Sequence, residues 1–320
     1  MDEDYPRNLP EFDARFATEE ACREYLMKVR WPDGFVCPRC QGREAWTTQR
    51  NLLVCGDCEY QASLTAGTVF EGTRKPLALW FKAMWWVTTQ KNGASALGLQ
   101  RVLGLATYYT AWTWLHKLRR AMVRPGRDRL NGRVEVDETY LGGLEEGIRG
   151  RGAQKKALVI VAAQEDGKRI GRIRLRRIAN ASRSQLHRFI RDTIEPGSVV
   201  HTDGWEGYGE LEEYTHKVTI LKGRTESASE LLPRVHLVIS LLKRWLLGTH
   251  QGAVSPEHLD YYLDEFAFRF NRRGSRSRGK LFYRLLQQAA AIEPTPYKAM
   301  VKHVKNGPEH KPKWLLERTE

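Results

Sequence analysis

Apolar and polar residues alternate in a stretch near the middle of the chain. Val134 and Val136 follow the strand period of two. An extended segment would turn the intervening polar side chains to the other face: Glu135, Asp137 and Thr139. Taken alone, the stretch also fits an edge strand with a solvated acidic face. A second β-branched run, residues 198–205, ends on Asp203 and a glycine turn. If these two strands are neighbours in one sheet, the aspartates can hold a hard divalent cation.

The sequence around both stretches predicts an α/β domain with a mixed sheet flanked by helices. Strands are expected at residues 134–141, 157–164 and 169–178, within the run 198–205 that carries Asp203, and at 217–221. The basic loop Arg149–Gly152 would join the first two, and a tight turn at residues 165–168 the next two. A helix that Ser182 or Ser184 can cap should precede the fourth strand and end before Pro196. Three antiparallel strands, a helix and a further strand follow the order of the RNase H-like fold.

A later helix, residues 231–245, has an apolar stripe at Val235, Ile239 and Leu242. His236 and Lys243 are seven residues apart, which is two helical turns, so both point the same way. His236 is a candidate third ligand for the two aspartates. An ordinary helix position without a ligand role remains open for it.

Four of the five cysteines form two Cys-x-x-Cys pairs with fourteen residues between them: Cys37, Cys40, Cys55 and Cys58. This spacing is typical of a zinc ribbon with four thiolate ligands and no open coordination position, so the zinc would be structural. A disulfide pair or a redox motif is the alternative, and a reducing compartment and the doubled motif argue against both. We expect Cys22 to be a buried thiol on a helix.

Residues 76–122 predict helices whose aromatic residues form a core rather than a surface for stacking bases. Two helices about Gly104 have the form of a helix-turn-helix, with Thr107–Thr113 at the front of the recognition helix. A simple helical hairpin fits nearly as well. Arg119–Arg133 then forms a basic linker with six arginines, for which a solvated run and phosphate contact both remain open.

Composition and charge indicate the partner. The chain has 320 residues, 41% of them hydrophobic, which is enough for about two domains with real cores. Lysine and arginine exceed aspartate and glutamate by 52 − 38 = 14, so we expect nucleic acid to bind. No apolar run is long enough to span a membrane, and the acidic N-terminus is unlike a signal peptide. A cytoplasmic, nucleoid-associated protein is therefore expected.

Together these motifs resemble one family along most of the chain, from about Phe12 to beyond Asn271. They are the first cysteine pair, residues 134–143, the Thr202–Trp205 run with Tyr208, residues 241–250, and the Glu-Phe-x-Phe-Arg-Phe-Asn-Arg-Arg run at residues 265–273. The chain resembles bacterial insertion-sequence transposases of the ISXO-like group. That resemblance implies a zinc ribbon, a helix-turn-helix and a DDE-type catalytic domain with an RNase H-like fold. It suggests domains at residues 1–73, 74–130 and 131–285, and a basic tail at 286–320.

The resemblance also implies the catalytic residues. Asp137 and Asp203 would be the first two metal ligands, and His236 stands where the wider superfamily has glutamate. Because imidazole is softer than carboxylate, His236 should weaken Mg²⁺ binding or favour Mn²⁺. Glu135, Glu226 and Glu230 are further candidates for the third ligand, and Lys243 would position a terminal phosphate.

The implied activity is DNA cleavage at the ends of the element and strand transfer into target DNA, by metal-dependent phosphoryl transfer with two ions and no covalent protein intermediate. Double-stranded DNA would be bound in a dimer or larger assembly, with the helix-turn-helix and the ribbon on the terminal inverted repeats. Residues expected to contact DNA are Thr107, Tyr108, Lys117, Arg119, Arg120, Lys243, Arg244, Arg272 and Arg273. The alternatives are a non-catalytic DNA-binding regulator, which includes an inactive transposase relic, and a general nuclease.

Overall fold

The computed structural model describes residues 3–124, 126–142, 156–220, 228–252, 254–297 and 300. The chain divides into two compact units. The first comprises the chain up to Arg124 together with Ser275–Met300, and the second comprises residues 125–274 together with the chain after Met300. The expected basic loop Arg149–Gly152 and the candidate ligand Glu226 lie outside the described residues.

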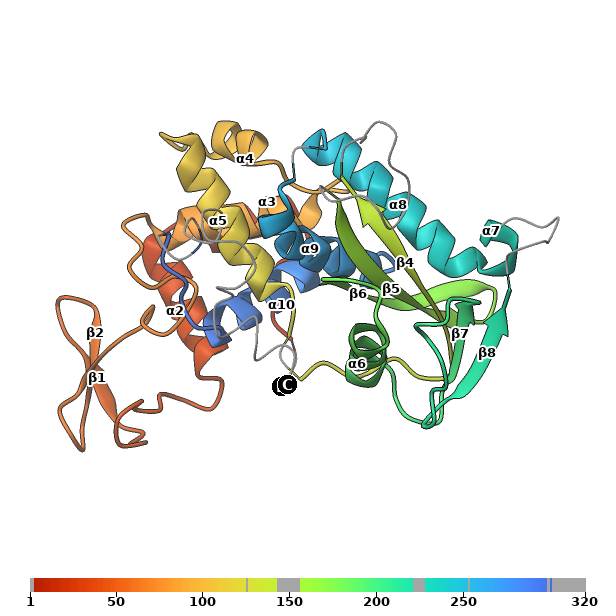
Figure 1. Ribbon diagram of the computed structural model, residues 1–320. Helices are drawn as coiled ribbons and strands as arrows, with labels where there is room; N and C mark the ends of the chain where they lie inside the picture. The colour runs from red at the N-terminus through yellow and green to blue at the C-terminus, as the bar shows by residue number, and fades with distance from the viewer. Residues whose placement is uncertain are drawn as a thin grey trace. The chain divides into compact units, whose positions relative to one another are not determined.

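Among the described residues of the second unit, five strands form one sheet in the order β6-β5-β4-β7-β8 (Figure 1). Their bounds are β4 Arg133–Leu141, β5 Ala157–Asp166, β6 Arg169–Ile178, β7 Val199–Asp203 and β8 Thr215–Thr219. The pairs β4–β5 and β5–β6 are antiparallel, whereas β4–β7 and β7–β8 are parallel. The sheet is therefore mixed, as predicted. The edge-strand interpretation of residues 134–141 is wrong, because β4 is the central strand.

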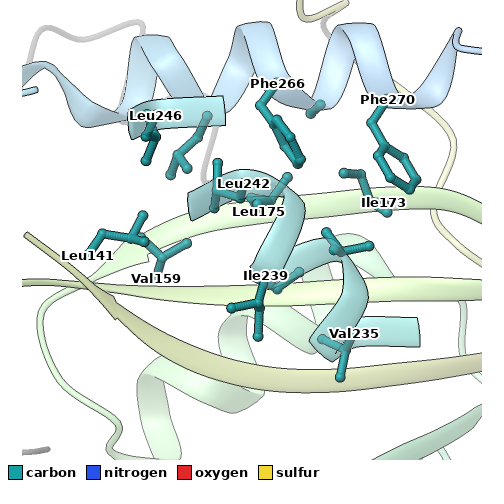
Figure 2. Close-up of a cluster of buried hydrophobic side chains, with 14 of the residues drawn as sticks. Leu141, Val159, Ile173, Leu175, Val235, Ile239, Leu242, Leu246, Phe266 and Phe270 are labelled. Carbon is teal, nitrogen blue, oxygen red and sulfur yellow. The ribbon is translucent and has the colours of Figure 1, made fainter. Parts of the chain in front are cut away.

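The two faces of the sheet carry separate hydrophobic cores. Even-numbered residues of β4, including Val134 and Val136, pack with α6 (Arg183–Thr193) through Leu186, Phe189 and Ile190. The other face packs against α8 (Pro233–His250) and α9 (Leu259–Asn271), as Figure 2 shows. The short segments α7 (Ala228–Leu231) and η2 (Pro256–His258) precede these two helices. Because strand side chains alternate, odd-numbered residues of β4 face α8. Ser182 is the N-cap of α6, but its side chain makes no capping hydrogen bond.

The run at residues 265–273 fastens α9 to the outer strand of the sheet. Asn271 Oδ1 accepts the backbone N–H of Ile173 at 2.7 Å, and Asn271 Nδ2 donates to the carbonyl of Ile173 at 3.2 Å. The fully buried Glu265 accepts Arg269 Nε at 2.8 Å. An edge strand leaves backbone groups unpaired, and here a side-chain amide satisfies two of them. Much of this run therefore stabilises the fold.

The first unit is helical, with a small sheet. Its helices are α1 Leu9–Arg15, α2 Glu19–Arg30, α3 Leu77–Thr89, α4 Ala96–Leu103, α5 Tyr108–Ala121 and α10 Arg278–Ala291. Strands β1 Ala45–Thr47, β2 Leu52–Cys55 and β3 Gln61–Ser63 pair antiparallel in that order. The aromatic residues of α3 form the core as predicted, since Trp80, Phe81 and Trp85 are buried and Trp80 stacks on Trp114 at 3.8 Å between ring centroids. Cys22 is buried on α2, also as predicted.

Helices α4 and α5 are joined by the predicted glycine turn. Gly104 ends α4 in the left-handed region, with φ of +60°, where glycine has no Cβ penalty. Ser95 caps α4 by accepting the N–H of Gly98 at 3.0 Å, and Thr107 caps α5 by accepting the N–H of Thr110 at 3.2 Å. The first turn of α5 stays at the surface, with Tyr108 47% and Tyr109 67% exposed.

Candidate functional site

Asp137 and Asp203 lie on adjacent parallel strands. The pairing of β4 with β7 places Glu135 opposite His201, and the two aspartates stand two residues further along each strand. Neighbouring strands are about 4.8 Å apart, and a shift of two residues keeps the same face. Val134, Val136 and Val200 belong to the core on the α6 side. Both aspartates therefore lie on the face that α8 covers.

Helix α8 brings His236 to Asp137. His236 Nε2 lies 3.7 Å from Asp137 Oδ2, and this buried nitrogen has no hydrogen-bond partner among the described residues. Asp203 Oδ1 accepts the backbone N–H of Trp205 at 3.0 Å, which fixes the carboxylate at the turn. A buried imidazole nitrogen facing a carboxylate without a hydrogen bond is suited to a shared cation.

Glu135 holds the first turn of α8 against β4. Its Oε2 accepts the backbone N–H groups of Arg234 at 2.7 Å and Val235 at 2.9 Å, and its Oε1 accepts Arg234 Nη1 at 3.0 Å. These N–H groups have no partner inside the helix, and a negative charge at this end also opposes the helix dipole. Glu135 is 5% exposed and its oxygens are engaged, so it acts as a remote helix cap rather than a free ligand.

Burial and negative neighbours make Asp137 a weak acid. Burial, followed by the charges of Glu138 and Asp203, raises the pKa of Asp137 to about 7. Burial lowers the pKa of His236, which favours the neutral imidazole that can act as a ligand. Lys243 is exposed. Its positive charge acts to lower the pKa of both Asp137 and His236, and so favours the ionised form of Asp137 and the neutral form of His236.

Glu138 and Tyr208 support the site from the other face of the sheet. The Tyr208 hydroxyl donates to Glu138 Oε2 at 2.7 Å, and Tyr208 is fully buried. Sequence reasoning assigned no role to Glu138. The alternation of β4 could have placed it on the α6 side, but only the fold shows that Tyr208 meets it there.

The four predicted zinc ligands converge at one point of the first unit. Cys37 Sγ lies 3.7 Å from Cys58 Sγ, Cys40 Sγ lies 3.5 Å from Cys55 Sγ, and all four sulfurs lie within 4.8 Å of one another. Tetrahedral zinc with Zn–S bonds of about 2.3 Å separates its sulfurs by about 3.8 Å. The cysteines therefore fit structural zinc. Among the described His, Cys, Asp and Glu side chains, no other group of three or more has its ligand atoms this close together. The possible ligand atoms at Asp137 are therefore farther apart than those of the four cysteines.

Two parts of the chain match known families of transposase domains. Residues 129–271 match the ISXO2-like transposase domain, and residues 17–61 match the transposase zinc-ribbon domain. The part at residues 129–271 is similar to ISXO2-like transposase domains. A protein of Halobacterium salinarum named as an uncharacterized protein in transposable element ISH50 is 28% identical over 288 residues, which cover 83% of this chain and 94% of that protein. The expected resemblance is therefore confirmed, and the matched transposase domain lies within the second structural unit.

Several residues expected to contact DNA are buried or half-buried in the first unit. Arg119 and Arg120 are 2% and 4% exposed, and they donate to the carbonyls of Ala94 at 3.4 Å and Glu293 at 3.2 Å. Lys117 Nζ donates to the carbonyl of Val69 at 3.4 Å, and burial lowers its pKa. The helical pattern put these cations at the end of α5 but could not show that the helix end is covered. We therefore no longer assign Arg119 and Arg120 to DNA.

The other expected DNA contacts differ in their accessibility. Thr107 and Tyr108 are exposed at the start of α5, and Lys243 and Arg244 are exposed on α8. Arg272 and Arg273 lie at the end of α9, with their guanidinium groups over the rings of Phe268 at 4.2 Å and Phe270 at 4.0 Å.

In the part of the chain that the structure describes, every helix is too short or too polar to cross a lipid bilayer.

Glu135→Ala tests whether Glu135 positions the first turn of α8, which carries the candidate ligand His236. The substitution leaves buried N–H groups and a guanidinium without their acceptor, so the free energy of unfolding of the second unit should fall by about 2–4 kcal/mol. Urea denaturation measures this loss, and hydrogen exchange should show faster exchange at Arg234 and Val235.

Glu165→Ala is the matched control for this capping role. Glu165 also pairs with Arg234, at 3.0 Å from Nη2, but within the described part of the chain it accepts no N–H of α8. Because this pair is half-exposed, its removal should cost less than about 1 kcal/mol. Equal losses for the two variants would show that Glu135 is only an ion-pair partner.

The raised pKa of Asp137 predicts a dependence of stability on pH in buffer without magnesium or manganese. The folded protein holds a proton that the unfolded chain releases near the ordinary value of 3.8, and keeps it up to about pH 7. The resulting stabilisation is full below the ordinary pKa and is lost as the pH rises through 7. Asp137→Asn should remove this loss, and the variant should exceed the parent chain by up to ~4 kcal/mol at pH 8, at about 1.4 kcal/mol per pKa unit.

Chemical denaturation at pH 5 and pH 8 measures this difference. The exposed Glu206→Gln is the control, because it makes the same change of charge at a solvent-exposed carboxylate. If Asp137→Asn and Glu206→Gln give the same stability profile, Asp137 is not the buried acid of this site.

Proposed function

We propose that the protein is a DNA transposase that cuts the ends of its element and joins them to target DNA by metal-dependent phosphoryl transfer. The observation that carries this proposal is the approach of His236 to Asp137 on β4, beside the strand that bears Asp203. These three residues lie in the domain that matches ISXO2-like transposases. Transposase domains support DNA as the substrate, and the net charge of +14 agrees with it.

The strand order supports an RNase H-like fold for this domain. Three antiparallel strands are followed by α6 and then by a strand parallel to the first, which makes β4 central. In this arrangement the first and fourth strands carry the two aspartates. The four-part division of the chain at residues 73, 130 and 285 stays a prediction.

Asp137, Asp203 and His236 would hold the catalytic cation. Their donor set suits Mg²⁺ or Mn²⁺, with the imidazole favouring Mn²⁺. When bound, such a cation supplies the Lewis acidity that lowers the pKa of an attacking water or 3′-hydroxyl. The half-buried carboxylates of Asp137 and Asp203 orient this centre from the rigid sheet, while Glu135 keeps the His236 turn in place. Lys243 would hold a phosphate at the mouth of the site, and the adjacent Arg244 would contact the backbone.

Recognition of the element ends is assigned to the first unit. Helices α4 and α5 would act as a helix-turn-helix, with Thr107 and Tyr108 at the exposed start of the recognition helix. The zinc ribbon would assist in this docking. Joining two ends requires two copies of the chain on DNA, so we expect a dimer or a larger assembly.

The test uses the full chain and a labelled duplex carrying the terminal repeats that flank its coding sequence. With Mn²⁺ we expect nicking at the repeat end, with weaker activity in Mg²⁺, and no nicking without a divalent cation. If the chain binds the duplex but nicks it with neither cation, the protein is instead a non-catalytic DNA-binding regulator. Cleavage that ignores the repeat sequence would establish a general nuclease.

A further inference from the structure

Arginines from three separate segments gather at the outer edge of β6. The sheet order makes β6 an edge strand, and its sequence is unusually rich in arginine. Segment 127–129 and the end of α9 both make hydrogen bonds to this edge. We define the edge arginine cluster as Arg127, Arg172, Arg174, Arg272 and Arg273.

Main-chain carbonyls hold the inner arginines of the cluster. Arg174 Nη1 donates to the carbonyl of Ile173 at 3.0 Å, and Arg174 Nη2 donates to the carbonyl of Asp128. Arg172 Nη2 donates to the carbonyl of Arg129 at 3.3 Å, while its Nη1 lies 3.5 Å from Asp128 Oδ2. These contacts fix the direction of the guanidinium groups, but a carbonyl does not neutralise a positive charge.

The end of α9 adds two more guanidinium groups to the same edge. Arg273 Nη1 donates to the carbonyls of Phe270 at 2.8 Å and Gly171 at 3.3 Å. Its Nη2 donates to the carbonyl of Ile170. Arg272 packs over the ring of Phe268. Stacked guanidinium groups keep their flat forks in one orientation, which suits phosphate recognition.

The cluster brings like charges together around a buried cation. Arg174 is 4% exposed, and burial, followed by the charges of Arg127 and Arg172, lowers its pKa to about 9. Arg272 adds to this repulsion, and Asp128 opposes it. A purely structural position of this kind is often as stable or more stable with an apolar side chain. Asp128 supplies one carboxylate to a group of several guanidinium groups, so the cluster keeps an excess of positive charge that an external anion can neutralise.

We propose that the edge arginine cluster is a binding site for the phosphate backbone of duplex DNA. The inference rests on the proposed function for the identity of the anion. Flat guanidinium forks match phosphate oxygens, and several adjacent cations match the closely spaced charges of a duplex. From the sequence, phosphate contact was left open for the linker Arg119–Arg133, which includes segment 127–129, whereas no DNA contact was expected of β6.

The register of the sheet places the cluster near the candidate catalytic site. Leu175, next to Arg174, pairs with Val161, and Val161 pairs with Asp137. Two strand spacings therefore separate the edge from Asp137 across the sheet, which is about 10 Å. Arg174 points to the other face from Asp137, so the cluster would hold DNA that flanks the reacting strand rather than the scissile phosphate.

The experiment measures how the affinity of the full chain for its repeat duplex depends on salt. Arg172→Gln combined with Arg272→Gln should lower the slope of log affinity against log salt by about 2, since each phosphate contact contributes about 0.9. At 0.1 M salt the dissociation constant should rise roughly 10- to 100-fold. The control is Arg188→Gln combined with Arg191→Gln, which changes the charge equally at two exposed positions of α6 and should leave the slope within about 0.5.

A second variant separates ligand binding from a structural role. Arg174→Met should keep or raise the thermal unfolding midpoint, because it removes a buried charge, and should also weaken DNA binding. A lower midpoint with an unchanged salt slope would overturn the proposal and leave Arg174 a structural residue. An unchanged slope in the double variant would overturn it as well.

The two proposals fail in different ways. If the parent chain nicks DNA and the double variant keeps the parent slope, the edge cluster is wrong and the transposase proposal stands. If the parent chain never nicks but the double variant lowers the slope, the cluster stands as a DNA site on a regulator. A parent chain that does not bind duplex DNA overturns both.

Discussion

Asp137→Asn and Asp203→Asn should each lower the rate of metal-dependent DNA nicking by at least about 10³-fold. Each substitution removes a negatively charged oxygen ligand from a candidate metal site that also includes the imidazole nitrogen of His236. A loss of about 4 kcal/mol in transition-state stabilisation corresponds to this factor. DNA affinity should change little, because both residues lie on the covered face of the sheet. Single-turnover cleavage of the labelled repeat duplex and a binding titration give the two numbers.

Asp192→Asn is the matched control for these two variants. Asp192 accepts Arg176 Nη1 at 2.7 Å on the α6 side of the sheet, so its substitution makes the same chemical change away from the site. Its nicking rate should stay within about threefold of the parent rate. His236→Glu should raise the rate in Mg²⁺ relative to Mn²⁺, since it restores a hard oxygen ligand. A nicking rate that survives both aspartate substitutions would remove this site from the reaction.

Cys55→Ser should release the zinc and unfold the ribbon. The strands β1, β2 and β3 are three or four residues long, which is too little to fold without support. Zinc binding to such segments supplies on the order of 10–16 kcal/mol of apparent free energy, which here is folding free energy. The metal content should fall from about one zinc per chain to near zero. Hydrogen exchange at Leu53 and Val54 should become fast, while β4 and β5 stay protected.

Cys22→Ala is the control for the loss of a cysteine. Cys22 is fully buried on α2, and its Sγ faces the carbonyl of Phe16 at 3.9 Å rather than the other thiols. This variant should keep its zinc and the protection of β2. Slow exchange at Leu53 in metal-free Cys55→Ser would show that the ribbon folds without zinc.

Local patterns in the sequence predicted the elements that carry the chemistry. The alternation at Val134 and Val136 predicted a strand and the face of Asp137, because side-chain direction in a strand depends only on position. The cysteine spacing predicted the four-sulfur cluster for a similar reason, since two tight knuckles have one way to surround a tetrahedral ion. Gly104 and Thr107 predicted the turn between α4 and α5.

Arg119 and Arg120 illustrate where local patterns fail. Two arginines at the end of a basic helix fit a DNA contact and fit a buried contact equally well. The sequence contains no signal for the carbonyls of Ala94 and Glu293 that accept them. Burial is a property of the whole fold, and it reversed the expected role of these two cations.

By itself the sequence determined the strand and helix periods, the zinc ligands and the identity of the residues that could bind a cation, because each follows from residue type and short-range spacing. Only the tertiary structure decided that β4 is central, that β7 lies beside it, and that Glu135 caps a helix about a hundred residues away. It also brought Arg127, Arg174 and Arg272 to one edge. These contacts join segments far apart in the chain, and the packing of two cores on opposite faces of one sheet selects them.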